Sequence, residues 1–502
     1  MSCQLQYLRH CLRQRIRRAL DELPDTLDET YDRTLEEIGK QNWEYAHRLF
    51  QCVAAASRPL RVKELAEFLA FDFDRDSTPT LREDWREEDP EHAVRSTCSS
   101  LLAIVDVDGS SVIQFAHFSV KEYLTSKRLA ESKETISRFH VSMTQAHTII
   151  AQACLGVLLH IDENITKVDL KKFPLAKYAA EHLGGHARFE GVSPKIQDGL
   201  KRLFDPSNHH FSVLVWIYHP KRRVGIPDKC ERPSQASATP LHFAAFHGVH
   251  DILSFLIVER SQKMNARGFN GGETPLSLAC RRGYSEVARV LLEHGADTDT
   301  RDTNDYSPLD WSSEGGHVEV VRVLLENHAD VNFLDGDKLT ALHLASSSGQ
   351  VAVARLLLEN GADANAKTTD GLTPLHCARN EGVTRVLLEY GADPTARDSR
   401  DRTPLHRAME VKYAEVARVL LENGVDANAR DAMNETPLHV ATIFQRLDGV
   451  QLLLQHGVDI HAQDGYGRTP FQVASEAESS GENRDIIMQL LLEHGAEDHR
   501  TQ

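Results

Sequence analysis

The sequence lacks the features that mark several classes of protein. No run of apolar residues approaches the ~20 needed to cross a bilayer, and the first residues lack the charged-then-apolar pattern of a signal peptide. Long blocks of lysine and arginine are missing too, and the formal net charge is −17, which argues against electrostatic binding of nucleic acid or an anionic membrane. We therefore expect a cytoplasmic protein with no membrane and no nucleic acid among its partners.

Cysteine is sparse, and catalytic motifs are missing. The eight cysteines are dispersed and include no CxxC pair, so we interpret them as reduced thiols in a cytosolic compartment. The histidines show no metal-site spacing either, so we expect no metal. GxSxG, HExxH and glycine-rich phosphate loops are not found, and the 74 carboxylates fall mostly in expected turns and on solvated helix faces. We expect no enzyme and no cofactor.

The second half of the chain repeats itself. Alignment on a Thr/Ser-Pro dipeptide gives eight registers, most of them 33 residues apart. The registers begin at Thr239, Thr274, Ser307, Thr340 (here followed by Ala), Thr373, Thr403, Thr436 and Thr469. A fixed period of this length is typical of a solenoid, in which each unit buries its apolar face only against its neighbours.

Each repeat predicts a turn and two helices. Thr or Ser caps the first helix and Pro occupies its first position, and a small residue always follows five positions after the Thr/Ser. A second helix carries apolar triplets such as Leu356-Leu357-Leu358 and ends at a glycine that suits a left-handed backbone. His328 replaces that glycine in the third repeat. Gly, Asp or Asn stands two residues before most Thr/Ser positions, as a turn with positive φ requires, and Lys338 is the exception.

Three repeats depart from the pattern. The fifth, TPLHCARNEGVTRVLLEYG, reaches its glycine three residues early, so we expect a shortened helix pair and a local kink. The eighth carries extra residues in SEAESSGENRD, which predicts a longer loop near a C-terminal cap. The first ends in IVERSQKMNAR without the glycine, as terminal units often do.

The motif T-P-L-H-x-A resembles the signature of the ankyrin repeat, which stands almost unaltered over residues 236–502. The resemblance implies a mostly α-helical ankyrin solenoid with a concave binding face. The fourth motif position holds histidine in five registers and Ser277, Asp310 or Gln472 in the others. Because these histidines fall once per repeat, we interpret them as structural hydrogen-bonding groups and not as ligands.

The first half predicts helices followed by a hairpin. Leu27, Tyr31, Leu35 and Ile38 recur at helical spacing, and LLAIVDVDGSSVIQF alternates around an Asp108-Gly109 turn. Together they indicate a winged-helix-like domain. Winged helices often bind DNA, but the helix before the hairpin offers only Arg95 for phosphate contacts.

Three phrases, LPDTLDETYDRTLEEI, ASRPLRVKELAEFLAF and IQFAHFSVKEYLTSKRL, resemble the winged-helix region of fungal NACHT-ankyrin proteins, relatives of NOD-like receptors. In that family a histidine of an F-x-H-x-S phrase touches the phosphate of bound ADP, and the resemblance places this role on His117. The alternative is a histidine that packs beside the wing. The chain has no GxxxxGK[ST] loop, so we expect nucleotide to bind only if a nucleotide-binding domain is supplied, as if an upstream domain had been left out.

The 502 residues are enough for several domains. We predict N-terminal helices at 1–38, a winged-helix-like domain at 39–130, a helical connector that caps the solenoid at 131–235, and eight ankyrin repeats at 236–502.

The predicted function is a protein-interaction scaffold, the sensing and regulatory part of a NACHT-type signalling protein. The alternative is a free-standing adaptor that delivers a client protein to an enzyme such as a ubiquitin ligase. Turn tips and the exposed side of each first helix form the expected contact wall, where aromatic and arginine side chains favour hot spots. The predicted partner contacts are Tyr306, Trp311, Asp337, Asp370, Arg400, Arg402, Arg407, Met433, Tyr466 and Arg468.

Overall fold

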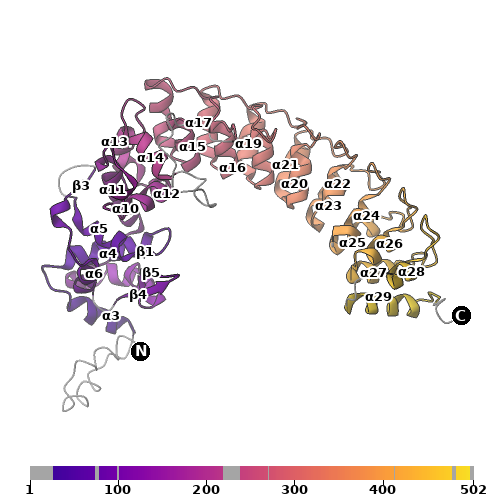
Figure 1. Cartoon of the computed structure of the whole chain (residues 1–502), viewed down its shortest axis with the longest axis horizontal. Coiled ribbons are helices and arrows are strands. Elements are labelled where there is room, and N and C mark those ends of the chain that lie inside the picture. Colours follow the sequence, from indigo (N-terminus) through magenta and orange to yellow (C-terminus); the bar gives the residue numbers. More distant parts are fainter. Residues whose placement is uncertain are drawn as a thin grey trace, which may run out of the picture. The chain divides into compact units, whose positions relative to one another are not determined.

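The protein is mostly helical and divides into two compact units (Figure 1). The computed structural model describes residues 27–73, 78–98, 101–218, 238–268, 271–411, 413–476 and 482–497. The first unit is Met1–Lys263 and the second is Met264–Gln502. The predicted helices before residue 27 and residues 477–481 of the predicted long loop of the eighth repeat lie outside the described residues.

The first unit begins with helices and a three-stranded sheet, which confirms the winged-helix prediction. The strands lie in the order β1-β5-β4, and both pairs are antiparallel. Its elements are α3 (Leu27–Glu36), α4 (Trp43–Ala55), β1 (Leu60–Arg61), α5 (Val62–Glu67), α6 (Pro90–Cys98), β4 (Leu102–Val107) and β5 (Ser110–Phe115). Shorter elements between α5 and α6 are η2 (Phe68–Ala70), β2 (Phe71–Asp72), β3 (Thr80–Leu81) and η3 (Glu83–Trp85).

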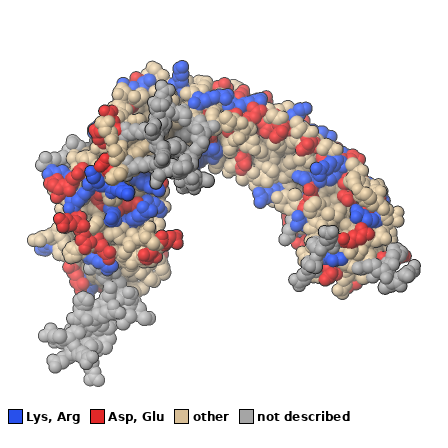
Figure 2. All heavy atoms as spheres, in the orientation of Figure 1, with Lys and Arg blue, Asp and Glu red and all other residues tan. Residues whose placement is uncertain are grey.

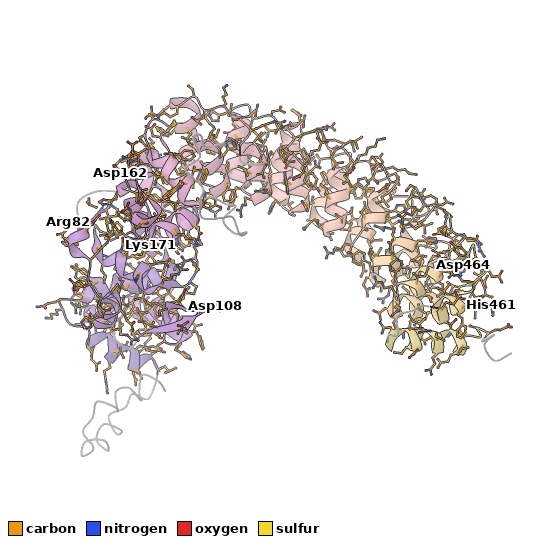
Figure 3. The ribbon with its side chains drawn as sticks, in the orientation of Figure 1. Arg82, Asp108, Asp162, Lys171, His461 and Asp464 are labelled. Atoms are coloured by element: carbon orange, nitrogen blue, oxygen red, sulfur yellow. The ribbon has the colours of Figure 1, made fainter. Side chains whose placement is uncertain are left out.

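The hairpin turn forms where the sequence predicts it. Asp108 and Gly109 have φ of 50° and 74°, the positive values that a two-residue hairpin turn requires. The Gly109 amide also donates to Asp106 Oδ1 at 2.9 Å. Figure 3 shows Asp108 at the end of this hairpin. The Asp-Gly signal therefore fixed both the turn and the β4–β5 register, in which Ile104 pairs with Ile113.

A helical bundle follows the sheet and meets the first repeat. The long helix α10 (Met143–His160) is apolar on most sides and packs against α4, α12 and α13. The α12 helix also packs against α15, the first helix of the first repeat. The remaining elements are α7 (Phe118–Leu124), α8 (Lys127–Ala130), α9 (Glu134–Ser137), α11 (Lys167–Leu170), α12 (Ala176–Ala187), α13 (Ser193–Phe204), α14 (His210–Tyr218), α15 (Pro240–His247), η5 (His250–Ile252) and η6 (Phe255–Glu259), a π-helical turn.

The second unit is a row of helix pairs (Figure 1). First helices pack on first helices and second helices on second helices, so the apolar face of each pair is covered only by its neighbours. The pairs are α16 (Pro275–Arg282) with α17 (Ser285–Glu293), α18 (Pro308–Glu314) with α19 (Val318–Glu326), α20 (Ala341–Ser348) with α21 (Val351–Glu359), α22 (Pro374–Cys377) with α23 (Glu381–Glu389), α24 (Pro404–Val411) with α25 (Ala414–Glu422), α26 (Pro437–Ile443) with α27 (Leu447–Gln455), and α28 (Pro470–Glu476) with α29 (Glu482–Glu493).

Four of the motif histidines link their first helix to the next turn. In the fifth repeat, the Thr373 amide donates to Nδ1 of His376 at 3.2 Å, and Nε2 lies 3.0 Å from the Arg402 carbonyl. Because Nδ1 accepts, Nε2 carries the proton and donates. His343, His406 and His439 make the same pair of bonds. The four rings are therefore neutral structural bridges, as the sequence predicts.

The departures from the repeat shorten one helix and leave the turn backbone unchanged. The α22 helix has 4 residues, whereas α23 keeps 9 residues like the second helices α21 and α25 on either side. The expected shortening of the helix pair therefore falls on the first helix alone. Asn380 then caps the second helix by accepting from the Val383 amide at 2.9 Å. His328 and Lys338 adopt φ of 65° and 58°, so both positions have the left-handed backbone that glycine, asparagine or aspartate supplies elsewhere.

Asp310 fills the histidine slot of the third repeat imperfectly. Its Oδ2 accepts from the Ser307 amide and hydroxyl at 2.9 and 2.7 Å, but its buried Oδ1 has no hydrogen-bond partner in the described part of the chain. Burial raises the pKa of Asp310 to about 6. The ionised carboxylate is therefore a local cost at neutral pH.

Histidine-to-glutamine replacement at positions 343, 376, 406 and 439 should make stability less sensitive to acid. Burial lowers the pKa of all four rings, that of His376 to about 4, so their contribution is present above pH ~6.5 and is lost as pH falls toward 4. Gln472 shows that glutamine accepts the same amide bond, at 2.8 Å. Thermal unfolding at pH 7.5 and 5.0 measures the difference. An equal loss of melting temperature in both proteins would contradict this role.

Replacement of Asp310 by Asn should stabilise the protein at pH 7.5 and not at pH 4. Because the pKa of Asp310 is higher in the folded protein than in the unfolded chain, its protonation stabilises the fold. This contribution is fully present below pH ~3.8 and is lost as pH rises through about 6. The shift of about two units corresponds to roughly 2–3 kcal/mol at neutral pH. Urea unfolding at both pH values measures it. As a control, Asp302→Asn replaces the Oδ2 that accepts from the Trp311 indole with an amide donor, and it should destabilise the protein at both pH values.

Candidate partner-binding surface

Aspartates organise the turns that precede the first helices. Asp464 Oδ1 accepts from the amides of Tyr466 and Arg468, both at 2.9 Å, and Figure 3 marks Asp464 and His461 in this turn. Asp302, Asp335, Asp398 and Asp431 accept from the amides two and four residues on in the same way. One carboxylate thus satisfies two turn amides in each of these repeats.

Main-chain hydrogen bonds join successive turns at one position, three residues before the Thr/Ser. We call this the tip position. Its carbonyl accepts an amide of the next turn, as in Gly465 to Met433 at 2.8 Å and Ala432 to Arg400 at 3.0 Å. The carbonyls of Gly271, Asp337 and Asp370 accept in the same way. The tip residues are Gly271, Asn304, Asp337, Asp370, Arg400, Met433 and Tyr466.

Five of the predicted contact residues occupy the tip position and are exposed. Met433 and Tyr466 keep 47% and 70% of their surface in solvent. The side chains of Asp337, Asp370 and Arg400 are exposed too. Within the described ranges none of these three charged groups has an ion pair. Their backbone is fixed while their side chains remain available to a partner.

Three predicted arginines are instead held by carboxylates of the same repeat. Arg402 contacts Asp398 at 2.9 Å and Glu410 at 2.8 Å, and Arg407 contacts Glu410 at 2.7 Å. Burial alone would raise the pKa of Asp398, but turn amides and the Arg402 guanidinium hold it below its usual value. Arg468 is paired likewise, with Asp464 at 2.9 Å and Glu476 at 3.4 Å. These arginines support the turns, whatever else they contact.

Tyr306 and Trp311 form a half-buried aromatic pair at the third repeat. Their ring centroids lie 4.9 Å apart, and the Trp311 indole N–H donates to Asp302 Oδ2 at 3.0 Å. The Arg281 guanidinium lies over the Trp311 ring at 5.2 Å. Burial raises the pKa of Tyr306. The structure therefore brings these two predicted contacts together and fixes them to the preceding turn.

Three exposed apolar side chains are not among the contact residues predicted from the sequence. Val411, Ile443 and Phe444 end the first helices α24 and α26 and are 37%, 40% and 43% exposed. The corresponding positions hold Arg281 and Arg282, or Ser347 and Ser348, in the second and fourth repeats. An apolar residue in a slot that is polar elsewhere was the available signal. Figure 2 shows charges of both signs scattered between uncharged residues along this unit.

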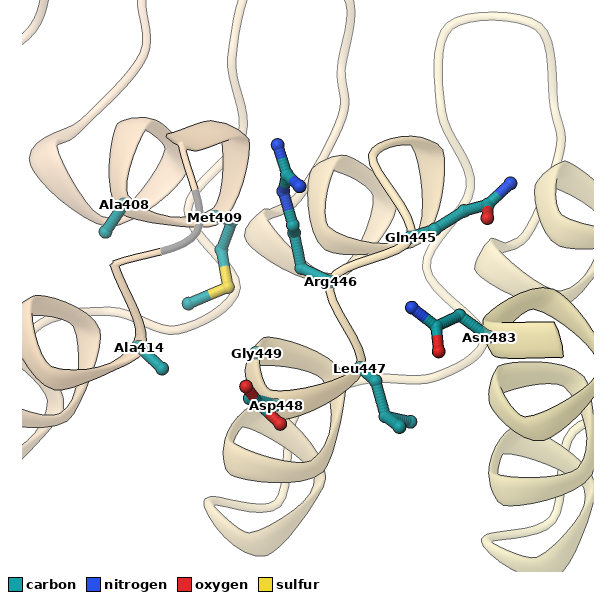
Figure 4. A pocket seen from close by; sticks show the side chains of 9 residues that line it. All are labelled: Ala408, Met409, Ala414, Gln445, Arg446, Leu447, Asp448, Gly449 and Asn483. Carbon is teal, nitrogen blue, oxygen red and sulfur yellow. The ribbon is translucent and has the colours of Figure 1, made fainter. Parts of the chain in front are cut away.

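A pocket of about 250 Å³ lies nearby, between the helix ends of the sixth to eighth repeats (Figure 4). Gly449 lines it at a position where other repeats have valine, as at Val416. A Cβ on Gly449 would lie 2.8 Å from Met409 Sδ, so the methionine occupies the space of the missing valine. The nine lining residues include no histidine, cysteine or serine, so they form no nucleophile–base pair.

His117 caps α7 in the first unit and is exposed. The Ser119 amide donates to its Nδ1 at 3.3 Å, and Ser119 Oγ lies 2.6 Å from the same atom. Tyr31 Oη in turn lies 2.8 Å from Ser119 Oγ. Because Nδ1 accepts, Nε2 carries the proton and can donate to an anion. The neighbouring Phe118 is 71% exposed. The phosphate role of His117 stays a prediction.

Metal and thiol sites are not found in the part of the chain that the structure describes. No three His, Cys, Asp or Glu residues there are grouped to hold a metal ion, and no helix there is long and apolar enough to span a bilayer. Cys52, Cys154, Cys280 and Cys377 are free thiols, and burial raises the pKa of each, that of Cys377 to about 11. Thiols with raised pKa values are poor nucleophiles at neutral pH.

Truncation of Arg402 should destabilise the protein, and truncation of Arg400 should not. Arg402→Ala leaves the buried Asp398 carboxylate without its cation and should cost about 1–3 kcal/mol, discounted for partial exposure. Arg400→Ala should change the free energy of unfolding by less than about 0.5 kcal/mol. Urea unfolding of both variants tests the distinction, and equal destabilisation would show that the tip arginine also supports the fold.

Comparison with known proteins finds a match in each half of the chain. The winged helix domain of GPI inositol-deacylase matches residues 31–137. Azaphilone pigments biosynthesis cluster protein L of Monascus ruber is 29% identical over 294 residues, which are 55% of this chain and 61% of that protein. BCL-6 corepressor-like protein 1 of Homo sapiens is 39% identical over 61 residues, 12% of this chain and 3% of that protein. The chain thus spans less than two thirds of these curated relatives.

The ankyrin resemblance is confirmed. A model described as ankyrin repeats (3 copies) matches residues 207–302, 294–368, 360–431, 385–464 and 426–502, which together cover 207–502 of the 502 residues. The helix pairs, the Thr/Ser-Pro caps and the linked turns explain these matches structurally. With more than half of its length matched, the chain belongs to the family of ankyrin-repeat proteins.

Proposed function

We propose that the protein is a scaffold that binds a partner protein through the tip residues and exposed first-helix ends of the second unit. One observation carries the proposal: the tip side chains are exposed while the turn backbone beneath them is fixed by carboxylates and by bonds to the next turn. A surface fixed before binding loses little conformational entropy when a partner docks.

Two chemical features support binding of a protein. Met433, Tyr466, Val411, Ile443 and Phe444 expose apolar surface over neighbouring repeats, and such surface on a soluble chain often marks an interaction site. Charged tips beside them offer specificity more than affinity. The repeats themselves are interaction modules.

Site-specific photocrosslinking tests this surface. Benzoylphenylalanine at Met433 should crosslink a partner protein in cells, and the same residue at Arg418, an exposed site on α25, should not. The purified partner should then bind the wild-type protein and bind the Met433→Glu variant at least about fivefold more weakly. Equal crosslinking from both sites would contradict the proposal.

We further propose that the chain is the regulatory part of a NACHT-type signalling protein, with the nucleotide-binding domain supplied separately or upstream. The winged-helix match and the F-x-H-x-S phrase at His117 support this assignment. The outward N–H of His117 suits contact with a phosphate held by another domain. Buried free thiols fit the cytoplasmic location that the proposal requires.

The nucleotide proposal predicts that this protein affects ADP binding only when a nucleotide-binding domain is present. A purified NACHT domain loaded with fluorescent ADP should release it several-fold more slowly when this protein is added, as measured by anisotropy. His117→Ala should remove the effect, and His92→Ala, an exposed histidine of the same unit, should retain it. Unchanged ADP release on addition of the wild-type protein would contradict the NACHT assignment and leave the scaffold role standing.

A further inference from the structure

The tip side chains change character in a fixed order along the repeats. Asp337 and Asp370 come first, Arg400 follows, and Met433 and Tyr466 complete the row. Building on the scaffold function proposed above, we infer that the partner segment carries the complementary order: two basic residues, one acidic residue, then two apolar residues. The segment lies along the row of linked turns from the fourth to the eighth repeat.

The charges that define this order are those with no internal partner. Arg402, Arg407 and Arg468 are neutralised by Asp398, Glu410, Asp464 and Glu476. The number of arginines in a repeat therefore does not by itself predict which charge the repeat presents to a partner. Asp337, Asp370 and Arg400 are exposed and have no ion pair in the described ranges. A partner residue of opposite charge gains most binding energy from such unpaired groups, because no ion pair within the repeats has to be broken first.

The apolar end of the row has a second line of contacts. Met433 and Tyr466 belong to the turns of the seventh and eighth repeats, and Val411, Ile443 and Phe444 end the first helices of the sixth and seventh. Adjacent first helices α24 and α26 are in direct contact. Two lines of exposed apolar side chains therefore lie on the same few repeats. This end should supply most of the affinity, and the charged end should set the direction of the segment.

The repeat spacing also predicts the conformation of the segment. Packed helices lie about 8–10 Å apart, so successive tips are separated by about that distance. A polyproline II segment advances about 9.3 Å in three residues and returns every third side chain to one face. A β-strand of three residues spans a similar length but turns that side chain to the opposite face. We therefore expect contacts at every third residue, over about 13 residues from the first basic to the last apolar position.

Selection from a random 16-residue peptide library displayed on phage tests the inference. The full chain is the target, and enriched peptides should show basic, basic, acidic, apolar and apolar residues at three-residue intervals. A synthetic peptide of the enriched sequence should bind about tenfold more weakly to Asp337→Lys with Asp370→Lys. The double variant Glu326→Lys with Glu359→Lys, which makes the same charge change on exposed residues of the second-helix row, should bind normally.

The outcomes separate this inference from the scaffold function. Enriched peptides without the charge order, or peptides whose affinity is the same for the tip variant and its control, would overturn the inference while the scaffold function stands. Arg400→Glu should impair the same peptide, and a peptide with lysine at its acidic position should regain binding to that variant. Failure of every enriched peptide to depend on any tip or first-helix end would contradict the scaffold function as well. Circular dichroism confirms that each variant is folded.

Discussion

Four repeats of the second unit depend on one interaction, the bond from the motif histidine to a carbonyl of the next repeat. A Thr/Ser cap begins the first helix, the histidine ring accepts the Thr amide, and the opposite ring nitrogen reaches across to the following turn. One side chain thus fixes a helix start and a repeat interface together. Because the rings are buried and neutral, this linkage works without charge. Where Asp310 replaces histidine, the same slot holds an unsatisfied oxygen.

Much of the fold follows from local sequence rules. Thr/Ser-Pro dipeptides, small residues and glycines predicted the helix pairs, and Asp108-Gly109 predicted the hairpin, because each acts within a few residues. His328 and Lys338 are exceptions to these residue rules, yet both have a left-handed backbone, because the repeat imposes that conformation whatever side chain is present. These rules act on the backbone, and the backbone conformation is the feature that stays the same from one repeat of this chain to the next.

The surface was harder to predict, because the availability of a side chain depends on its neighbours. Arg400 and Arg402 are alike in sequence, yet only Arg402 reaches Asp398 and Glu410. A signal existed: Asp464 and Arg468 repeat the four-residue spacing of Asp398 and Arg402. Trp311 is fixed by an aspartate nine residues earlier, a contact that only the folded turn creates. Val411, Ile443 and Phe444 were missed because apolar residues at helix ends look like core until the packing is known.

The four-residue helix α22 carries a mechanical consequence. The neighbouring first helices α20 and α24 have eight residues each, so the first helix of the fifth repeat is half as long as those on either side. In a linear array, stability is a sum over units and the junctions between them. The second helix α23 keeps 9 residues and packs on α21 and α25, so it carries a larger share of the junctions of the fifth repeat than second helices carry elsewhere in the second unit. Asp337 and Asp370 come before this short helix along the chain, and Met433 and Tyr466 come after it, so a segment that binds the whole row crosses the repeat whose junctions depend most on its second helix.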